Sequence, residues 1–238
     1  MRYILIIFFL SVNLTLSFAN SEKNEGTISN STSGVLDIYY VGSDDACEYG
    51  SIQDAIDAAN NSQNATEVRI ARNMGYFENL QIINSNILID GSYGNCADAR
   101  NNIHIDGTTI LNDESESGQV TIKVTGLFVH IKAITLINND DGGIFANDTS
   151  VITLEEMVFN QLGSHALHIT GNNQIDLRIK NSTFLNNTAE NGAAIFCSGS
   201  NHSIEVTEET EFINNSAQGR GGAIYLLGDC DFSMSGGK

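Results

Sequence analysis

The stretch that decides the fold is FINNSAQGRGGAI, residues 212–224, because both of its halves recur earlier in the chain. The first half, FINN, is preceded by FLNN at residues 184–187 and by LINN at residues 136–139. The second half, GGAI, is preceded by GAAI at residues 192–195. A repeat length in the twenties is that of one coil of a parallel β-helix, with about three short strands per coil and coils stacked at ~4.8 Å.

The recurring residue types have different roles in such a coil. Phe159, Phe184 and Phe212, which are 25 and 28 residues apart, predict a ladder of inward side chains. Asn tolerates the left-handed conformation, and its amide can bond to the Asn of the neighbouring coil. The Gly pair gives a sharp corner, and the Ala lets coils approach closely. The repeat positions are Phe184, Asn187, Gly192, Ile195, Phe212, Asn215, Gly221, Gly222, Ala223 and Ile224.

Most of the remaining sequence alternates apolar and other residues in short runs separated by Asn, Asp, Gly or Ser, which predicts strands. These runs are residues 68–70, 80–82, 87–89, 103–105, 120–124, 127–136, 151–154, 166–169, 175–179 and 204–206. The chain contains no proline, which suits strands that are nearly all central and need their N–H groups. The sequence therefore predicts an all-β fold, a single-stranded right-handed parallel β-helix solenoid.

Residues 51–59 form the only segment with a helical pattern. Ile52, Ala55, Ile56 and Ala59 fall on one face, and Ser51 is a suitable N-cap with an acidic residue three positions later. We expect this short amphipathic helix to cover the N-terminal end of the solenoid, where an open sheet edge would invite aggregation.

The N-terminal residues have the pattern of an export signal. Residues 1–19 contain the basic Arg2, an apolar run and the small-x-small site Ser17-Phe18-Ala19, which indicates a secretory signal peptide. Residues 20–34 have almost no apolar content and are predicted to be a disordered leader. We assign residues 35–67 to an N-terminal cap and residues 68–238 to the coils. No later stretch is apolar and long enough to predict a transmembrane helix.

The chain is strongly acidic. Its formal charge is −18, and loss of Arg2 with the signal peptide would make it −18 − 1 = −19. Such a surface repels nucleic acids and anionic polysaccharides, so we expect no nucleic-acid partner. Carboxylates could hold Ca²⁺, and the acidic stretches are residues 113–116 and 208–209, but each is local in sequence and more typical of a solvated loop. We therefore predict no cofactor.

Four cysteines in an exported chain predict two disulfides. Cys47 with Cys96 and Cys197 with Cys230 are the pairs that we favour, although four cysteines allow three connectivities. A zinc site is the poorer interpretation, because no two of the four have metal-ligand spacing.

The repeats at residues 184–195 and 212–224 resemble those of the polymorphic outer membrane protein family, and residues 49–59 resemble the N-terminal segment of pectin-lyase-like β-helix proteins. The resemblance implies an exported surface or adhesin-like protein of a Gram-negative bacterium, without implying one activity. We expect the protein to be secreted or to lie on the cell surface or outer membrane. Expected partners are a glycan, a cell surface or another protein, in an unknown oligomeric state. Because a solenoid needs its last coil covered, we expect either that the chain is truncated at its C-terminal end or that its exposed last coil is a docking edge.

The alternative function is polysaccharide degradation. The acidic pair Asp140 and Asp141, then His165, then Arg178 and Lys180 follow the order found in polygalacturonase-like glycosidases. In that hypothesis the aspartates are acid and base, the histidine tunes their ionisation, and the cations hold a sugar carboxylate. A Ca²⁺-dependent lyase is a further option. We favour a structural role for these residues, because aspartates are ordinary at repeat turns and the cations alternate with an apolar residue as outward side chains do.

Overall fold

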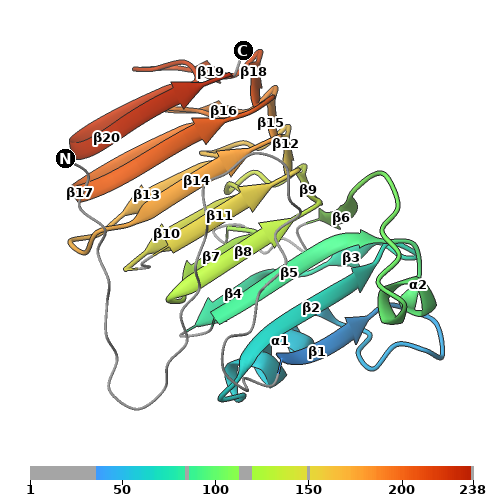
Figure 1. Cartoon of the computed structure of the whole chain (residues 1–238). Helices are drawn as coiled ribbons and strands as arrows, with labels where there is room; N and C mark the ends of the chain where they lie inside the picture. The colour runs from blue at the N-terminus through green and yellow to red at the C-terminus, as the bar shows by residue number, and fades with distance from the viewer. Residues whose placement is uncertain (1–35, 84–85, 113–119, 149–150, 237–238) are drawn as a thin grey trace.

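The computed structural model describes residues 36–83, 86–112, 120–148 and 151–236. It is a parallel β-solenoid of about seven turns with very little helix, which confirms the predicted fold class (Figure 1). The predicted signal peptide and leader lie outside the described residues, as does the acidic stretch at residues 113–116.

Strands of successive coils pair in parallel and form three columns along the solenoid. The first column consists of β4 (Leu80–Ile83), β7 (Ile122–Thr125), β10 (Ile144–Asn147) and β13 (Leu167–Thr170). The second column consists of β1 (Leu36–Val41), β2 (Ala65–Ala71), β5 (Asn86–Tyr93), β8 (Phe128–Lys132), β11 (Val151–Glu155) and β14 (Asp176–Lys180). The third column consists of β3 (Tyr76–Phe77), β6 (Thr109–Asn112), β9 (Ile134–Ile137), β12 (Val158–Asn160), β15 (Thr183–Leu185) and β18 (Glu211–Ile213).

Two long strands, β17 (Ile195–Thr207) and β20 (Ile224–Ser235), extend through both the first and the second columns. A short pair, β16 (Thr188–Ala189) and β19 (Ser216–Ala217), follows the third column. We call the outward surfaces of the three columns the first, second and third faces.

The predicted phenylalanine ladder forms the core of the third column. Phe159 stacks on Phe184 with ring centroids 4.6 Å apart, and Phe184 stacks on Phe212 at 4.9 Å. In the coils below, Leu136 and Leu111 occupy the same inward position. Because these side chains are in register, each coil covers the apolar surface of the one beneath it.

The sequence predicted two roles for the repeated asparagines, a left-handed turn and a hydrogen bond between coils. In the structure, each role belongs to a different member of the Asn pair. The first of each pair adopts a left-handed conformation, with φ of 55° at Asn186 and 52° at Asn214. The second points inward: Asn187 Nδ2 donates to Asn215 Oδ1 at 2.8 Å and to the Phe159 carbonyl at 3.1 Å. Leu162 N–H in turn donates to Asn187 Oδ1. One asparagine therefore turns the chain while its neighbour satisfies buried backbone groups.

The Gly corners also form as predicted. Gly192 and Gly221 have φ of 56° and 61°, and a Cβ at either would collide with a backbone carbonyl of the same corner. Ala194, two residues after the first of them, is fully buried. Small residues are therefore required where successive coils turn into the first column.

The N-terminal helix is confirmed as α1 (Ile52–Asn60), and its buried residues are the four predicted ones. It packs on β1, β2 and β4. Ser51 is the N-cap, as Asp54 N–H donates to its Oγ at 3.2 Å. The carboxylate at the helix start is Glu78 of a following coil, which accepts from the N–H groups of Ile52 and Gln53 at 2.9 Å.

Two details differ from the expectations. Residues 103–105, predicted as a strand, form only an isolated bridge between His104 and Tyr93, because a second helix, α2 (Cys96–Arg100), turns the chain out of the column just before them. This five-residue helix was not predicted. The parallel sheet also already includes β1 within the segment assigned to the cap.

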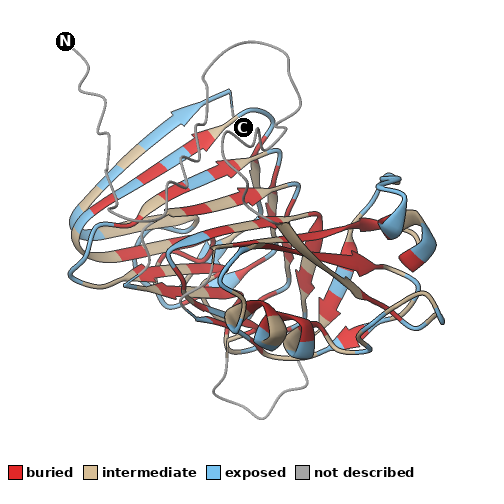
Figure 2. Ribbon diagram, turned by 60° about the horizontal axis from the view of Figure 1, so that its bottom comes forward, coloured by how far each residue is buried: buried red, intermediate tan, exposed pale blue. Residues whose placement is uncertain are grey.

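Both favoured disulfides are present. Cys47–Cys96 ties the loop after β1 to α2, and Cys197–Cys230 ties β17 to β20 across 33 residues of sequence. A crosslink closing a loop of that length stabilises a fold by about 3–4 kcal/mol in the chain-entropy model. The central coils have buried inward residues, whereas β20 is mostly exposed (Figure 2). The Cys197–Cys230 disulfide therefore attaches the most exposed strand covalently to the coil beneath it.

Candidate functional site

A row of ring-bearing side chains on the first face is the most distinctive outward feature of the solenoid. Phe145, His168, Phe196 and Tyr225 occupy one register position on β10, β13, β17 and β20, and we call them the aromatic row. Neighbouring ring centroids are 5.0, 4.9 and 5.8 Å apart along the row. All four side chains are half-buried. The rings therefore stabilise one another across strands and still reach solvent.

His165 extends this row sideways at the corner before β13. Its ring stacks on Phe196 at 4.7 Å, and its Nδ1 lies 3.2 Å from the Gly192 carbonyl oxygen. Burial lowers the pKa of His165. Burial, together with the neighbouring His165, lowers the pKa of His168 to about 4. At neutral pH both imidazoles are therefore uncharged, and the aromatic row carries no charge.

A second outward row on the same face is polar. Asn147, Thr170 and Ser198 lie two residues after the members of the aromatic row on β10, β13 and β17, and we call them the polar row. Ser198 Oγ donates to Thr170 Oγ1 at 3.1 Å. Rings and hydrogen-bonding groups thus run side by side over successive coils.

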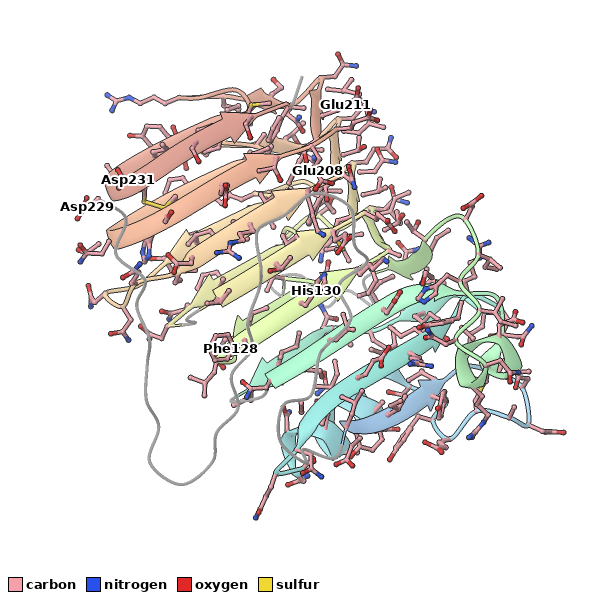
Figure 3. All side chains as sticks on the ribbon, viewed as in Figure 1. Phe128, His130, Glu208, Glu211, Asp229 and Asp231 are labelled. Atoms are coloured by element: carbon pink, nitrogen blue, oxygen red, sulfur yellow. A yellow bond between two sulfur atoms is a disulfide. The ribbon has the colours of Figure 1, made fainter. Side chains whose placement is uncertain are left out.

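The second face presents charged side chains that pair with each other. Glu155 lies between His130 and Lys180, with 3.0 Å from its carboxylate oxygens to each partner nitrogen. Burial would raise the pKa of Glu155, but the hydrogen bonds and charges of its partners outweigh it and lower the pKa to about 2. Figure 3 places His130 at the middle of this face. The three groups come from β8, β11 and β14, so they tie three coils together.

The structure places the residues of the glycosidase hypothesis at separate locations. Asp140 and Asp141 lie at the corner between β9 and β10, and Asp141 N–H donates to Asn139 Oδ1 at 2.6 Å. His165 occupies the same corner one coil further on, where its carbonyl accepts from Gly143. The acidic pair and the histidine are thus brought to one edge of the first column.

Arg178 and Lys180 lie instead on β14, on the second face. Arg178 Nε is 3.8 Å from Glu205, and Lys180 pairs with Glu155, so both have partners among the outward carboxylates of neighbouring strands. The five residues do not form one site, and no sugar carboxylate held by these cations would lie beside the aspartates.

One constellation with the residue types of a hydrolase does occur. Ser92 Oγ is 2.6 Å from His104 Nδ1, and Asp90 Oδ2 is 3.7 Å from that same nitrogen. A catalytic relay needs the carboxylate and the hydroxyl on opposite ring nitrogens. Here both compete for one nitrogen, so this arrangement cannot activate the serine in that way.

Among the residues that the structure describes, only Asp44, Cys47 and Cys96 group like metal ligands. The two sulfurs are joined in a disulfide, and Asp44 accepts from the Cys96 N–H at 3.0 Å. Glu208, of the predicted acidic stretch, lies on the opposite side of the C-terminal coil from Asp229 and Asp231 in Figure 3.

The aromatic row was missed at the level of sequence, although a signal exists. Each member directly follows the apolar residue that ends a corner motif, as in Ile144-Phe145, Leu167-His168, Ile195-Phe196 and Ile224-Tyr225. An aligned ring-bearing residue in four successive coils would have identified the row. Another residue missed was His202, whose ring is buried with neither nitrogen hydrogen-bonded within the described part of the chain.

The fold and these surfaces define a repeat-built parallel β-solenoid without an assembled catalytic centre among its described residues. The family model for the Chlamydia polymorphic membrane protein repeat matches residues 181–198 and 209–226, the coils that carry the FLNN and FINN motifs. The match confirms repeats of this type and supports a protein of the outer-membrane surface class.

The comparison with curated proteins and that with solved structures gave no match. The resemblance to pectin-lyase-like proteins therefore stays a prediction. No helix in the described segments is long and apolar enough to span a membrane.

Proposed function

We propose that this protein is a surface-exposed, non-enzymatic binding module that recognises a neutral glycan through the first face of its solenoid. The observation that carries the proposal is the aromatic row lying beside the polar row. Sugar rings offer apolar faces that pack on aromatic side chains, and their hydroxyls exchange hydrogen bonds with groups such as Thr170 and Ser198.

Charge favours a neutral ligand over an acidic one. The chain carries a formal charge of −18, which repels polyanions at low and moderate salt. The aromatic row is uncharged at neutral pH, because burial lowers the pKa values of His165 and His168. A neutral polysaccharide can therefore approach this face without an electrostatic penalty.

Repetition favours an extended ligand. The row spans four coils, so a chain molecule can make several weak contacts at once. After the first contact, each further one is intramolecular, and the total affinity exceeds that of any single contact. The ladders inside the solenoid hold the outward positions at fixed spacing, so little ordering entropy is lost on binding.

The test is to screen the purified protein against an array of neutral and acidic glycans, then to repeat the screen with Phe196→Ala and Tyr225→Ala. We expect binding to at least one neutral polysaccharide, weakened at least tenfold by either substitution. Arg178→Gln, on the second face, is the matched control and should bind like the original protein.

Thermal unfolding of each variant separates lost binding from lost folding. Absence of binding to every glycan by the folded protein would contradict the proposal. If Phe196→Ala and Tyr225→Ala bind the glycan as tightly as the original protein, the assignment of binding to the first face is wrong. Release of new reducing ends from a bound polysaccharide would contradict the non-enzymatic part of the proposal.

A further inference from the structure

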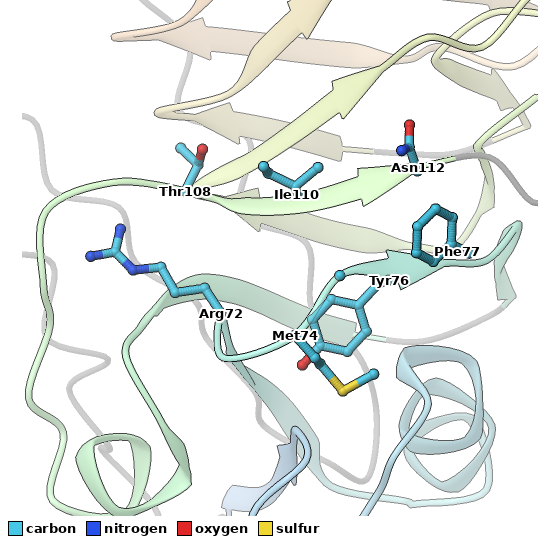
Figure 4. A pocket seen from close by; sticks show the side chains of 8 residues that line it. Arg72, Met74, Tyr76, Phe77, Thr108, Ile110 and Asn112 are labelled. Atoms are coloured by element: carbon cyan, nitrogen blue, oxygen red, sulfur yellow. The ribbon is translucent and has the colours of Figure 1, made fainter.

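A small cleft opens on the third face, away from the aromatic row. It lies between β3 and β6, has a volume of about 210 Å³, and is lined by Arg72, Met74, Gly75, Tyr76, Phe77, Thr108, Ile110 and Asn112. Figure 4 shows Arg72 at one end beside Thr108, with Phe77 and Asn112 at the other end and Ile110 between them. The cleft thus has a cationic end, an apolar middle formed by Ile110, and an end where the apolar Phe77 lies beside the polar Asn112.

The cation in this cleft has no acidic partner in the described part of the chain. Arg72 takes part in none of the ion pairs found among residues 36–83, 86–112, 120–148 and 151–236, and its side chain makes no hydrogen bond there. In a chain with 29 acidic and 11 basic residues, an arginine with no carboxylate partner among the residues that the structure describes is a candidate anion site.

Gly107 positions this arginine. Its φ is 113°, and a Cβ built on it would overlap Nη1 of Arg72, so the guanidinium lies directly against the backbone of the loop before β6. A planar guanidinium held in this way presents its remaining N–H groups as a fork that matches a carboxylate.

The apolar part of the cleft is exposed to solvent. Phe77 and Ile110 are 55% and 51% exposed, unusual values for large apolar side chains on neighbouring strands. Tyr76 beneath them is buried, and its hydroxyl donates to the Ala71 carbonyl at 2.6 Å, so the floor is fixed. Apolar walls with a few placed polar groups are typical of small-molecule sites.

The volume limits the occupant. Sites for drug-sized ligands begin at about 300 Å³, and this cleft is smaller, so it has room for one ring or a short alkyl chain. We propose that the cleft binds a small free carboxylic acid, with the carboxylate on Arg72 and an apolar body of about one ring against Phe77 and Ile110.

The probe is 3-phenylpropionate, and 3-phenylpropanamide is its neutral counterpart. Methyl NMR signals of Met74 and Ile110 report on binding directly. For an acid of this size we expect a Kd of about a millimolar. The amide should bind at least tenfold more weakly, and 0.5 M salt should weaken the acid several-fold while leaving the amide unchanged.

Arg72→Gln should weaken 3-phenylpropionate binding at least tenfold. Phe77→Ser, at an exposed position where folding is not at risk, should weaken both probes equally. Lys123→Gln, at an exposed cation on β7 of the first face, is the matched control and should change nothing. The first-face variants Phe196→Ala and Tyr225→Ala should also leave this binding intact, so failure of the glycan proposal and failure of this one are distinguishable.

Equal affinity for acid and amide, or an unchanged affinity of Arg72→Gln, would overturn the proposal. A peptide ending in Phe with a free carboxylate that binds much more tightly than 3-phenylpropionate would overturn the choice of a free acid as the occupant.

Discussion

The first and second faces are built on the same solenoid but present opposite chemistry. On the first face, Phe145, His168, Phe196 and Tyr225 form an uncharged row. On the second face, several outward positions hold charged side chains that have partners in the neighbouring coils, as Glu155 does.

The difference shows how a solenoid separates folding from function. Inward ladders such as Phe159, Phe184 and Phe212 fix the register, and outward residues inherit it. On the second face, Glu155 is held by two basic partners from neighbouring strands. On the first face the rings remain available, and this is why we assign binding there.

The largest effect is expected at the buried Asn187, at the corner between β15 and β16. Asn187→Ala removes the acceptor of the Leu162 N–H and donors to the Phe159 carbonyl and Asn215. Each buried backbone group left without a partner costs about 1–3 kcal/mol, so the free energy of unfolding should fall by about 3 kcal/mol. Chemical denaturation measures this.

Asn186→Gly is the matched control for that substitution. Asn186 is exposed and has φ of 55°, a conformation that Gly adopts freely, so stability should change by no more than about 0.5 kcal/mol. Equal losses from the two substitutions would show that the inward asparagines do not hold the coils together.

A smaller effect is expected from Glu155→Gln on the second face. The pKa of Glu155 is lowered to about 2, so its charged form stabilises the fold fully above pH 4.5, and this contribution is lost as the pH falls towards 2. Allowing for screening by solvent, Glu155→Gln should lower the free energy of unfolding at pH 7 by about 2 kcal/mol. Unfolding of the variant should be less pH-dependent between pH 4.5 and 2 than that of the original protein.

The first face should respond in a different pH range. Burial and the nearby His165 lower the pKa of His168 to about 4, whereas an unfolded histidine titrates near 6.5. The unfolded chain therefore takes up the proton first, and, with the same allowance for solvent as for Glu155, the free energy of unfolding falls by about 2 kcal/mol as the pH drops from 6.5 to 4. His168→Phe should remove this loss while leaving the step below pH 4.5 in place.

The smallest effect is expected from Arg178→Gln. Its ion pair with Glu205 is 3.8 Å long, and both side chains are more than half exposed. Pairs of this kind contribute about 0–1 kcal/mol, and stability should change by no more than about 0.5 kcal/mol. A larger loss in denaturant unfolding would show that the second face is a cooperative network that includes this arginine.

The features that recur in sequence could be predicted, because each coil repeats them in phase. The Phe ladder, the Asn pairs and the Gly corners follow from the residue types at recurring intervals. The helix α1 was predicted from its own apolar periodicity, and the two disulfides were the favoured pairs among three possible connectivities. Other non-repeating features could not be predicted. The helix α2 has only five residues, too few for a periodic pattern, and it displaced residues 103–105 from the column.

The candidate sites depended on register, which the sequence specified only to within a few residues. His130, Glu155 and Lys180 are 25 residues apart in sequence, and only the observed pairing of β8, β11 and β14 places them side by side. The same holds for Arg72, whose position depends on the backbone of Gly107. A coil shifted by one residue would turn each of these side chains to the other surface.

The most direct test of the division between the two faces is an NMR titration with the neutral glycan that the array identifies. Aromatic signals of Phe145, Phe196 and Tyr225 and the imidazole signals of His168 report on the first face, and those of His130 report on the second. We predict shifts that saturate together on the first face, with His130 unchanged. Shifts at His130 without shifts in the aromatic row would contradict the account.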